Sequence, residues 1–173
     1  ISACFICAYA SFYISFKLAS ILLTTLIICF FYIKIPGTHF SIRSIPYSKP
    51  FVIALCWSLT TSLLATTDVW SFLDCFMFIF ILSIPFDIKD AKEDEQDKIT
   101  TFATQYPTKL KMILFFLALL YSIFGYAYRN EFYFLIFLPL YALFISGKES
   151  PWKYYLGLDG LIILRLIFYF YQQ

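Results

Sequence analysis

Long apolar runs dominate this chain, and short polar or charged breaks separate them. An α-helix needs about 20 mostly apolar residues to cross a bilayer, within a range of about 17 to 25. Seven runs approach or reach that length, and breaks of only a few residues between several of them favour antiparallel hairpins. The predicted helices cover residues 1–16, 18–33, 50–67, 69–86, 109–128, 131–146 and 154–171. We predict a single all-α domain over residues 1–173.

The composition indicates that these helices lie in a membrane. Of the 173 residues, 61% are hydrophobic, 23% are aromatic and only 14% are charged. Soluble domains are about a quarter charged and just under half apolar. A soluble fold of this length could not bury so much apolar surface. We therefore expect an integral membrane protein with about seven transmembrane helices, surrounded by lipid and without a nucleic-acid partner.

The basic residues predict which face of this protein is cytoplasmic. With seven spans, one face holds the loops 34–49, 87–108 and 147–153. Together with the two lysines that open the fifth span, these loops carry ten of the thirteen Lys and Arg residues. The opposite loops carry only Lys17 and Arg129. Because loops rich in Lys and Arg stay on the inner side, we expect the three basic loops to be cytoplasmic.

Charge is concentrated in FDIKDAKEDEQDKITTF, residues 86–102, which holds six carboxylates and three lysines. Its four aspartates, spaced 3, 4 and 3 residues apart, are Asp87, Asp90, Asp94 and Asp97. On a helix, at about 100° per residue, they form one stripe, with Lys89 and Lys92 on the far side. Such a stripe costs stability unless a positive group lies against it. It is either a solvated loop or a site for a hard cation such as Mg²⁺, which carboxylates and substrate phosphates hold together.

The residues just before this stripe are apolar, and Pro85 stands among them. Proline removes a backbone hydrogen bond and clashes with the preceding helical turn. We therefore expect the helix over residues 69–86 to break or kink at Pro85.

Three segments resemble the UbiA family of intramembrane prenyltransferases. The run IPFDIKDAKEDEQDKITTF resembles the family's second aspartate-rich motif, D-I-R-D-x-x-x-D-R-x-x-G-x-x-T. The residues that match this motif in place include Asp87, Asp90, Asp94 and Thr101. RSIPYSKPFVIALCW (43–57) resembles the basic loop between the family's fourth and fifth helices, and YLGLDGLIIL (155–164) resembles its last helix. The seven predicted helices would then correspond to helices three to nine of a nine-helix fold.

The chain departs from the family pattern in several places. Lys98 stands where the family has glycine, and Thr100 stands where it has a basic residue. The tyrosine expected four residues before the loop lysine would fall at Ile45, whereas Tyr47 is offset by two. Residues 1–33 contain no Asp or Glu for the family's first aspartate-rich motif. The resemblance therefore implies that the N-terminal helices are missing, with the first motif upstream of this chain or absent.

The resemblance implies an Mg²⁺-dependent enzyme that transfers an isoprenoid chain from its diphosphate to a lipophilic or aromatic acceptor, in quinone, haem or pigment-type biosynthesis. The implied metal ligands are Asp87, Asp90 and Asp94, with Asp90 and Asp94 as the main catalytic carboxylates. Lys49 and Arg43 would contact the diphosphate, although positive-inside topology alone also explains basic residues there. The alternative is a non-catalytic, degenerate family member that acts as a lipid-binding or scaffold protein.

Asp159, Arg165 and Asp74 place charge inside predicted spans. Asp159 matches an LDG pattern in the family's last helix, where it either faces the cavity or lies at the interface. Arg165 is eight residues, about 12 Å, from the chain end, and Asp74 lies at a comparable depth from the same outer face. Charged groups at such depth are costly against lipid. We predict a structural Asp74–Arg165 pair, with snorkelling of Arg165 to the outer surface as the alternative.

Overall fold

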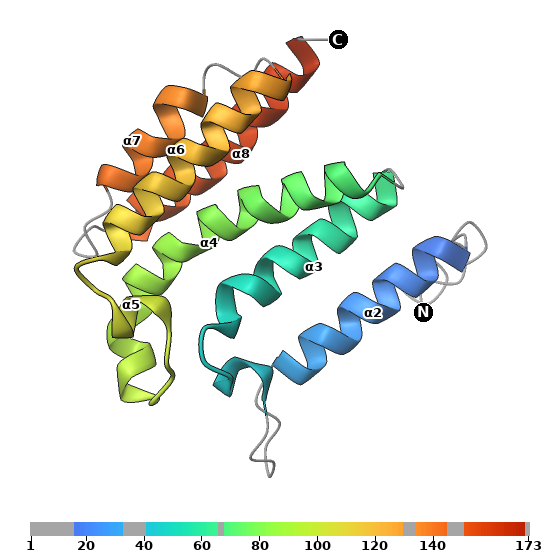
Figure 1. The fold of residues 1–173 in the computed structure, drawn as a ribbon. Coiled ribbons are helices and arrows are strands. Elements are labelled where there is room, and N and C mark those ends of the chain that lie inside the picture. Colours follow the sequence, from blue (N-terminus) through green and yellow to red (C-terminus); the bar gives the residue numbers. More distant parts are fainter. Residues whose placement is uncertain (1–15, 33–40, 66–67, 130–133, 145–150, 172–173) are drawn as a thin grey trace.

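The computed structural model describes residues 16–32, 41–65, 68–129, 134–144 and 151–171 (Figure 1). These described residues form helices and turns and contain no strand, which confirms the all-α class. In chain order the elements are α2 (Phe16–Tyr32), η1 (Ile42–Ser44), α3 (Ser48–Ala65), α4 (Val69–Gln96), α5 (Phe102–Gln105), α6 (Leu110–Arg129), α7 (Phe134–Phe144) and α8 (Pro151–Tyr171). Six of the seven predicted helices are present. The predicted helix 1–16 lies almost entirely outside the described residues.

Of the two alternatives predicted at Pro85, a break or a kink, the break is wrong. Pro85 lies inside α4, is buried, and is followed by eleven more helical residues, up to Gln96. A proline in a helix interior costs roughly 3 kcal/mol. Close packing next to the proline offsets this cost, since Ile81 and Ile84 are each 2% exposed. As a result, the aspartate stripe lies on the same helix as the apolar part of α4.

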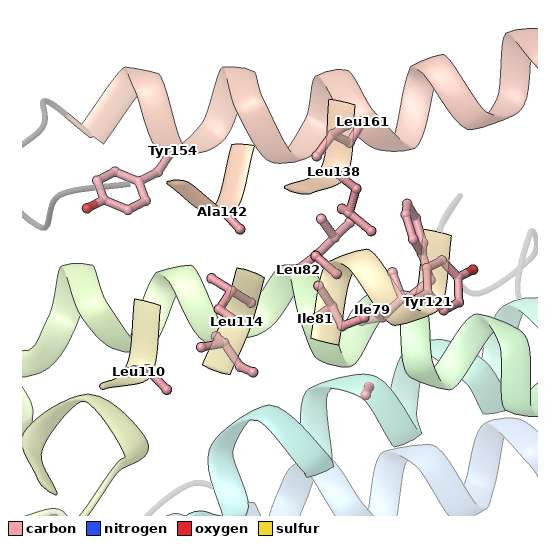
Figure 2. Packing of buried hydrophobic residues seen from close by; sticks show 14 of the residues in the cluster. Ile79, Ile81, Leu82, Leu110, Leu114, Tyr121, Leu138, Ala142, Tyr154 and Leu161 are labelled. Atoms are coloured by element: carbon pink, nitrogen blue, oxygen red, sulfur yellow. The ribbon is translucent and has the colours of Figure 1, made fainter. Parts of the chain in front are cut away.

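The helices pack in two groups on either side of α4 (Figure 1). On one side α3 lies against α4, and α2 lies against α3. On the other side α6 and α8 contact α4, while α7 contacts both α6 and α8. Figure 2 shows Leu82 of α4, Leu138 of α7 and Leu161 of α8 pointing into the space between these helices. All three are at most 6% exposed, so this is the apolar core of the described structure.

The predicted Asp74–Arg165 pair is confirmed. The Arg165 guanidinium of α8 donates to Asp74 Oδ2 on α4, and the Tyr121 hydroxyl of α6 donates to Asp74 Oδ1 (2.8 Å). The guanidinium also lies over the Phe78 ring, 4.6 Å from its centroid. This network joins three helices and neutralises two charges within the apolar part of the fold. Asp159, on α8, is exposed.

Two helices among the described residues are long and apolar enough to cross a membrane, Val69–Gln96 and Leu110–Tyr128. Leu18–Tyr32 is also apolar but shorter. Many large apolar side chains on these helices and their neighbours lie on the outer surface. Examples more than half exposed are Leu26, Phe30, Trp57, Phe116, Leu120 and Ile163.

Candidate functional site

Serine hydroxyl groups stabilise the turn that contains η1. The Ser44 hydroxyl donates to the carbonyl of Ser41 (2.7 Å), and the Ser48 hydroxyl donates to the carbonyl of Ile42 (2.7 Å). Such serine bonds to nearby backbone compete with regular helix and favour tight turns. α3 then begins at Ser48, so that Lys49 stands in its first turn. Arg43 and Lys49 are thereby held on a compact connection next to α4.

Tyr47 ties this connection to the segment that follows α4. Its amide N–H donates to the carbonyl of Thr100 (3.0 Å), and its hydroxyl donates to Gln105 Oε1 (2.6 Å). Its ring lies 4.8 Å from the Phe102 ring, between centroids. Thr101, which matches the family motif, is 1% exposed and caps α5 by accepting from the Thr104 amide. The two predicted functional loops therefore meet at one end of the helix bundle.

Lys98 stands at the end of α4 in a left-handed backbone conformation, with φ of 57°. The Lys98 amide donates to the carbonyl of Glu95 (3.1 Å), and the Ile99 amide donates to the carbonyl of Asp94 (2.7 Å). These two bonds form a Schellman motif, in which the residue after the helix cap is usually glycine. The position where the UbiA pattern has glycine is thus one at which the backbone itself favours glycine.

Replacing Lys98 with glycine should stabilise the protein by about 0.5 to 1 kcal/mol, because a residue with a Cβ is disfavoured in the left-handed region. The free energy of unfolding in detergent would measure this gain. Lys98→Ala is the matched control: it removes the same charge but keeps the Cβ. An equal gain from alanine would assign the effect to charge and contradict the backbone explanation.

Five charged side chains converge where the two loops meet. The Lys49 ammonium donates to Asp90 Oδ2 (3.0 Å) and Asp94 Oδ2 (3.1 Å), and lies 3.6 Å from Asp87 Oδ1. The Arg43 guanidinium contacts the other oxygen of Asp94 (3.3 Å). We call Arg43, Lys49, Asp87, Asp90 and Asp94 the inner cluster. It supplies the positive partner that the aspartate stripe requires and brings together all the predicted site residues.

Much of the inner cluster is withdrawn from solvent. Asp94 is 0% exposed and Asp87 is 1% exposed, whereas the Asp90 side chain is 29% exposed. Burial raises the pKa of Asp87 to about 6, although Lys49 acts against that rise. Burial alone would lower the pKa of Lys49, but the hydrogen bond to Asp90 and the three nearby carboxylates raise it above its usual value. Lys49 therefore stays charged.

Other predicted and unpredicted residues surround the inner cluster. Asp97, the last member of the stripe, forms the C-cap of α4 and is exposed, so it does not join the cluster. Lys89 was expected on the far side of the helix, yet its ammonium lies 3.9 Å from Asp90 Oδ1. Tyr32, at the end of α2, lies close enough to interact electrostatically with Lys49 and Arg43. No sequence pattern pointed to Tyr32 beyond its place at the end of a predicted span.

The inner cluster matches the donor chemistry of Mg²⁺ but does not form a complete cage. Both carboxylate oxygens of Asp87 are buried without a hydrogen-bond donor, and oxygen atoms of this kind are the ligands that Mg²⁺ prefers. Within the described part of the chain, however, no three His, Cys, Asp or Glu side chains are grouped so that they could hold a metal ion. The Lys49 ammonium lies where the carboxylates converge. A bound cation would therefore share these carboxylates with Lys49.

Comparison with known proteins gives no match: no family model, no curated protein and no solved structure is significantly similar to this chain. The function is therefore argued from the residues and geometry of the site.

Proposed function

We propose that this chain is an integral membrane prenyltransferase of the UbiA type, with Mg²⁺ as its cofactor. It would transfer an isoprenoid chain from its diphosphate to a lipophilic or aromatic acceptor. The observation that carries the proposal is the inner cluster. Arg43, before α3, and Lys49, in the first turn of α3, contact aspartates near the end of α4 that lie over 40 positions further along the chain. These are the two segments that resemble the family's diphosphate-binding loops.

Membrane residence is part of the same proposal. It is supported by two helices of sufficient length and apolar character and by the large apolar side chains on the outer surface. We expect about seven spans, with the loops 34–49, 87–108 and 147–153 in the cytoplasm. The inner cluster would then lie at the cytoplasmic end of the bundle.

The charges of the inner cluster suit a diphosphate that arrives with a cation. Its carboxylates outnumber its basic groups, so a diphosphate alone would be repelled. One or two of the carboxylates of Asp87, Asp90 and Asp94 would hold Mg²⁺ together with the diphosphate oxygens. The chemical contribution of the bound ion would be to offset negative charge on the leaving diphosphate. Arg43 Nε has no hydrogen-bond partner, so this guanidinium keeps an unused donor for a phosphate oxygen. Lys49 would orient the carboxylates and contact the same anion.

A second candidate is a non-catalytic membrane protein in which the inner cluster only fastens the loops together. One observation favours it: Lys49 and Arg43 already engage three of the four oxygens of Asp90 and Asp94. Carboxylates paired in this way form a structural ion-pair network that needs no bound ligand.

Binding of an allylic isoprenoid diphosphate to the protein in lipid vesicles tests the proposal. We expect saturable binding that requires Mg²⁺ and is lost when a chelator removes the metal, because the carboxylates otherwise repel the anion. Inorganic sulfate, matched for ionic strength, is the control for non-specific attraction to basic loops. Binding that is indifferent to Mg²⁺ and to the chelator would contradict the proposed site and favour the fastening role.

A further inference from the structure

A groove of about 840 Å³ lies between the first part of α4 and the last part of α6. Figure 1 shows the start of α4 and the end of α6 on the side of the molecule away from α5, so the groove is remote from the inner cluster. Along α4, Asp68 and Asp87 are separated by roughly 28 Å at 1.5 Å per residue. The walls of the groove are mainly apolar and include Leu73, Met77, Leu120 and Phe124. The volume is within the range of pockets that hold small molecules.

The mouth of the groove combines a carboxylate with two exposed aromatic side chains. Asp68, Trp70 and Tyr128 all line it, and Trp70 and Tyr128 are 74% and 76% exposed. Asp68 caps α4 by accepting from the amides of Trp70 (3.3 Å) and Ser71 (2.9 Å). The bond from the Ser71 amide, followed by that from the Ser71 hydroxyl, holds the pKa of Asp68 below its usual value. Asp68 is therefore ionised, and no basic side chain within the described ranges pairs with it.

The floor of the groove is neutral although it contains a second carboxylate. Asp74 lines the groove, but its two oxygens accept from Tyr121 and Arg165. An apolar chain can lie over this network without facing an unbalanced charge. Leu73 and Leu120, 44% and 64% exposed, leave the groove open along its apolar walls. The groove thus has an apolar bed at one end and an anionic, aromatic mouth at the other.

We propose that this groove binds a membrane phospholipid whose headgroup carries an ammonium group, choline or ethanolamine. An acyl chain lies along Leu73, Met77 and Leu120, and the ammonium group lies between Asp68 and the rings of Trp70 and Tyr128. Aromatic faces attract alkylammonium groups, and the Asp68 carboxylate adds an ionic contact. The same carboxylate repels a lipid that has the phosphate but no ammonium group. The inference rests on the membrane residence in the proposed function, and it is independent of prenyl transfer.

Quenching of tryptophan fluorescence by brominated lipids tests this site. Trp57→Phe/Trp152→Phe leaves Trp70 at the groove, and Trp70→Phe/Trp152→Phe leaves Trp57 on the outer surface of α3. Each variant is placed in phosphatidylglycerol vesicles, and acyl-brominated phosphatidylcholine or acyl-brominated phosphatidylglycerol is added. We expect the choline lipid to quench Trp70 at a mole fraction about five- to tenfold lower than the glycerol lipid does. Trp57 should be quenched equally by both lipids.

The charge of Asp68 is tested by adding Asp68→Asn to the Trp57→Phe/Trp152→Phe variant, which retains Trp70. Asparagine caps a helix about as well as aspartate, so α4 should still begin at the same place while the charge is lost. We expect the preference for the choline lipid to fall to about twofold or less, with the aromatic rings supplying the remainder. Equal quenching of Trp70 by the two lipids, or an undiminished preference in Asp68→Asn, overturns the lipid site. Absence of quenching of Trp57 by either lipid overturns membrane residence instead, so the two failures are distinguishable.

Discussion

Replacing Lys49 with methionine should destabilise the protein by about 3 to 5 kcal/mol, the typical cost of removing one partner from a buried ion pair. Methionine keeps an unbranched side chain of similar length but removes the charge. Asp87 and Asp94 would then remain buried, at 1% and 0% exposure, without the ammonium that neutralises them. The free energy of unfolding, measured by denaturant titration in detergent, would report this loss.

Lys92→Met is the matched control for this substitution. Lys92 is an exposed lysine in the acidic part of α4, so its replacement should change the free energy of unfolding by no more than about 0.5 kcal/mol. Equal effects of the two substitutions would show that Lys49 contributes only to the general charge balance, which contradicts the geometry of the inner cluster.

The effect of Lys49→Met should also depend on pH. The pKa of Asp87 is raised from 3.8 to about 6 in the folded protein, so the stability that its bound proton supplies is present below pH 3.8 and is lost as pH rises through about 6. Without Lys49, which lowers that pKa, Asp87 should hold its proton to still higher pH. Lys49→Met should therefore be less destabilising at pH 5 than at pH 7. A pH-independent loss would indicate that packing, not charge, is responsible.

The parts of the fold that could be predicted from the sequence are those that depend on local pattern. Apolar run length predicted six of the described helices, and the 3-4 spacing predicted that Asp87, Asp90 and Asp94 share one face of α4. The Asp74–Arg165 pair was predictable because both residues lie at a similar depth, where an unpaired charge is costly. In each case one strong physical preference decided the outcome.

The remaining features depend on contacts between distant parts of the chain. The sequence did not reveal that Lys49 lies at the centre of three carboxylates, because this depends on how η1 folds and on the contact of Tyr47 with Thr100. The continuation of α4 through Pro85 could not be predicted because packing around the proline, which no local rule describes, outweighs the lost hydrogen bond. The left-handed backbone at Lys98 was hidden because the residue usual at such a position is glycine.

In the full-length protein, Asp90→Asn should lower Mg²⁺-dependent turnover of an allylic diphosphate by about 100-fold or more while leaving the fold intact. The substitution removes one anionic oxygen ligand from the proposed metal site, and the loss of a ligand or its supporting partner typically costs at least 10- to 100-fold. Asparagine still offers an oxygen that accepts from Lys49, and the Asp90 side chain is 29% exposed. The free energy of unfolding should therefore fall by no more than about 1 kcal/mol.

Asp97→Asn provides the comparison that separates catalysis from general charge. Asp97 continues the same stripe, is exposed at the C-cap of α4, and lies outside the inner cluster, so its replacement should leave turnover within about twofold of the unsubstituted protein. Equal losses in Asp90→Asn and Asp97→Asn would mean that the net charge of the loop, not the site, controls activity. Full turnover in Asp90→Asn would show that the reaction does not require the Asp90 carboxylate. If the unsubstituted full-length protein shows no turnover and Asp90→Asn changes only stability, the inner cluster fastens the loops and the prenyltransferase proposal fails.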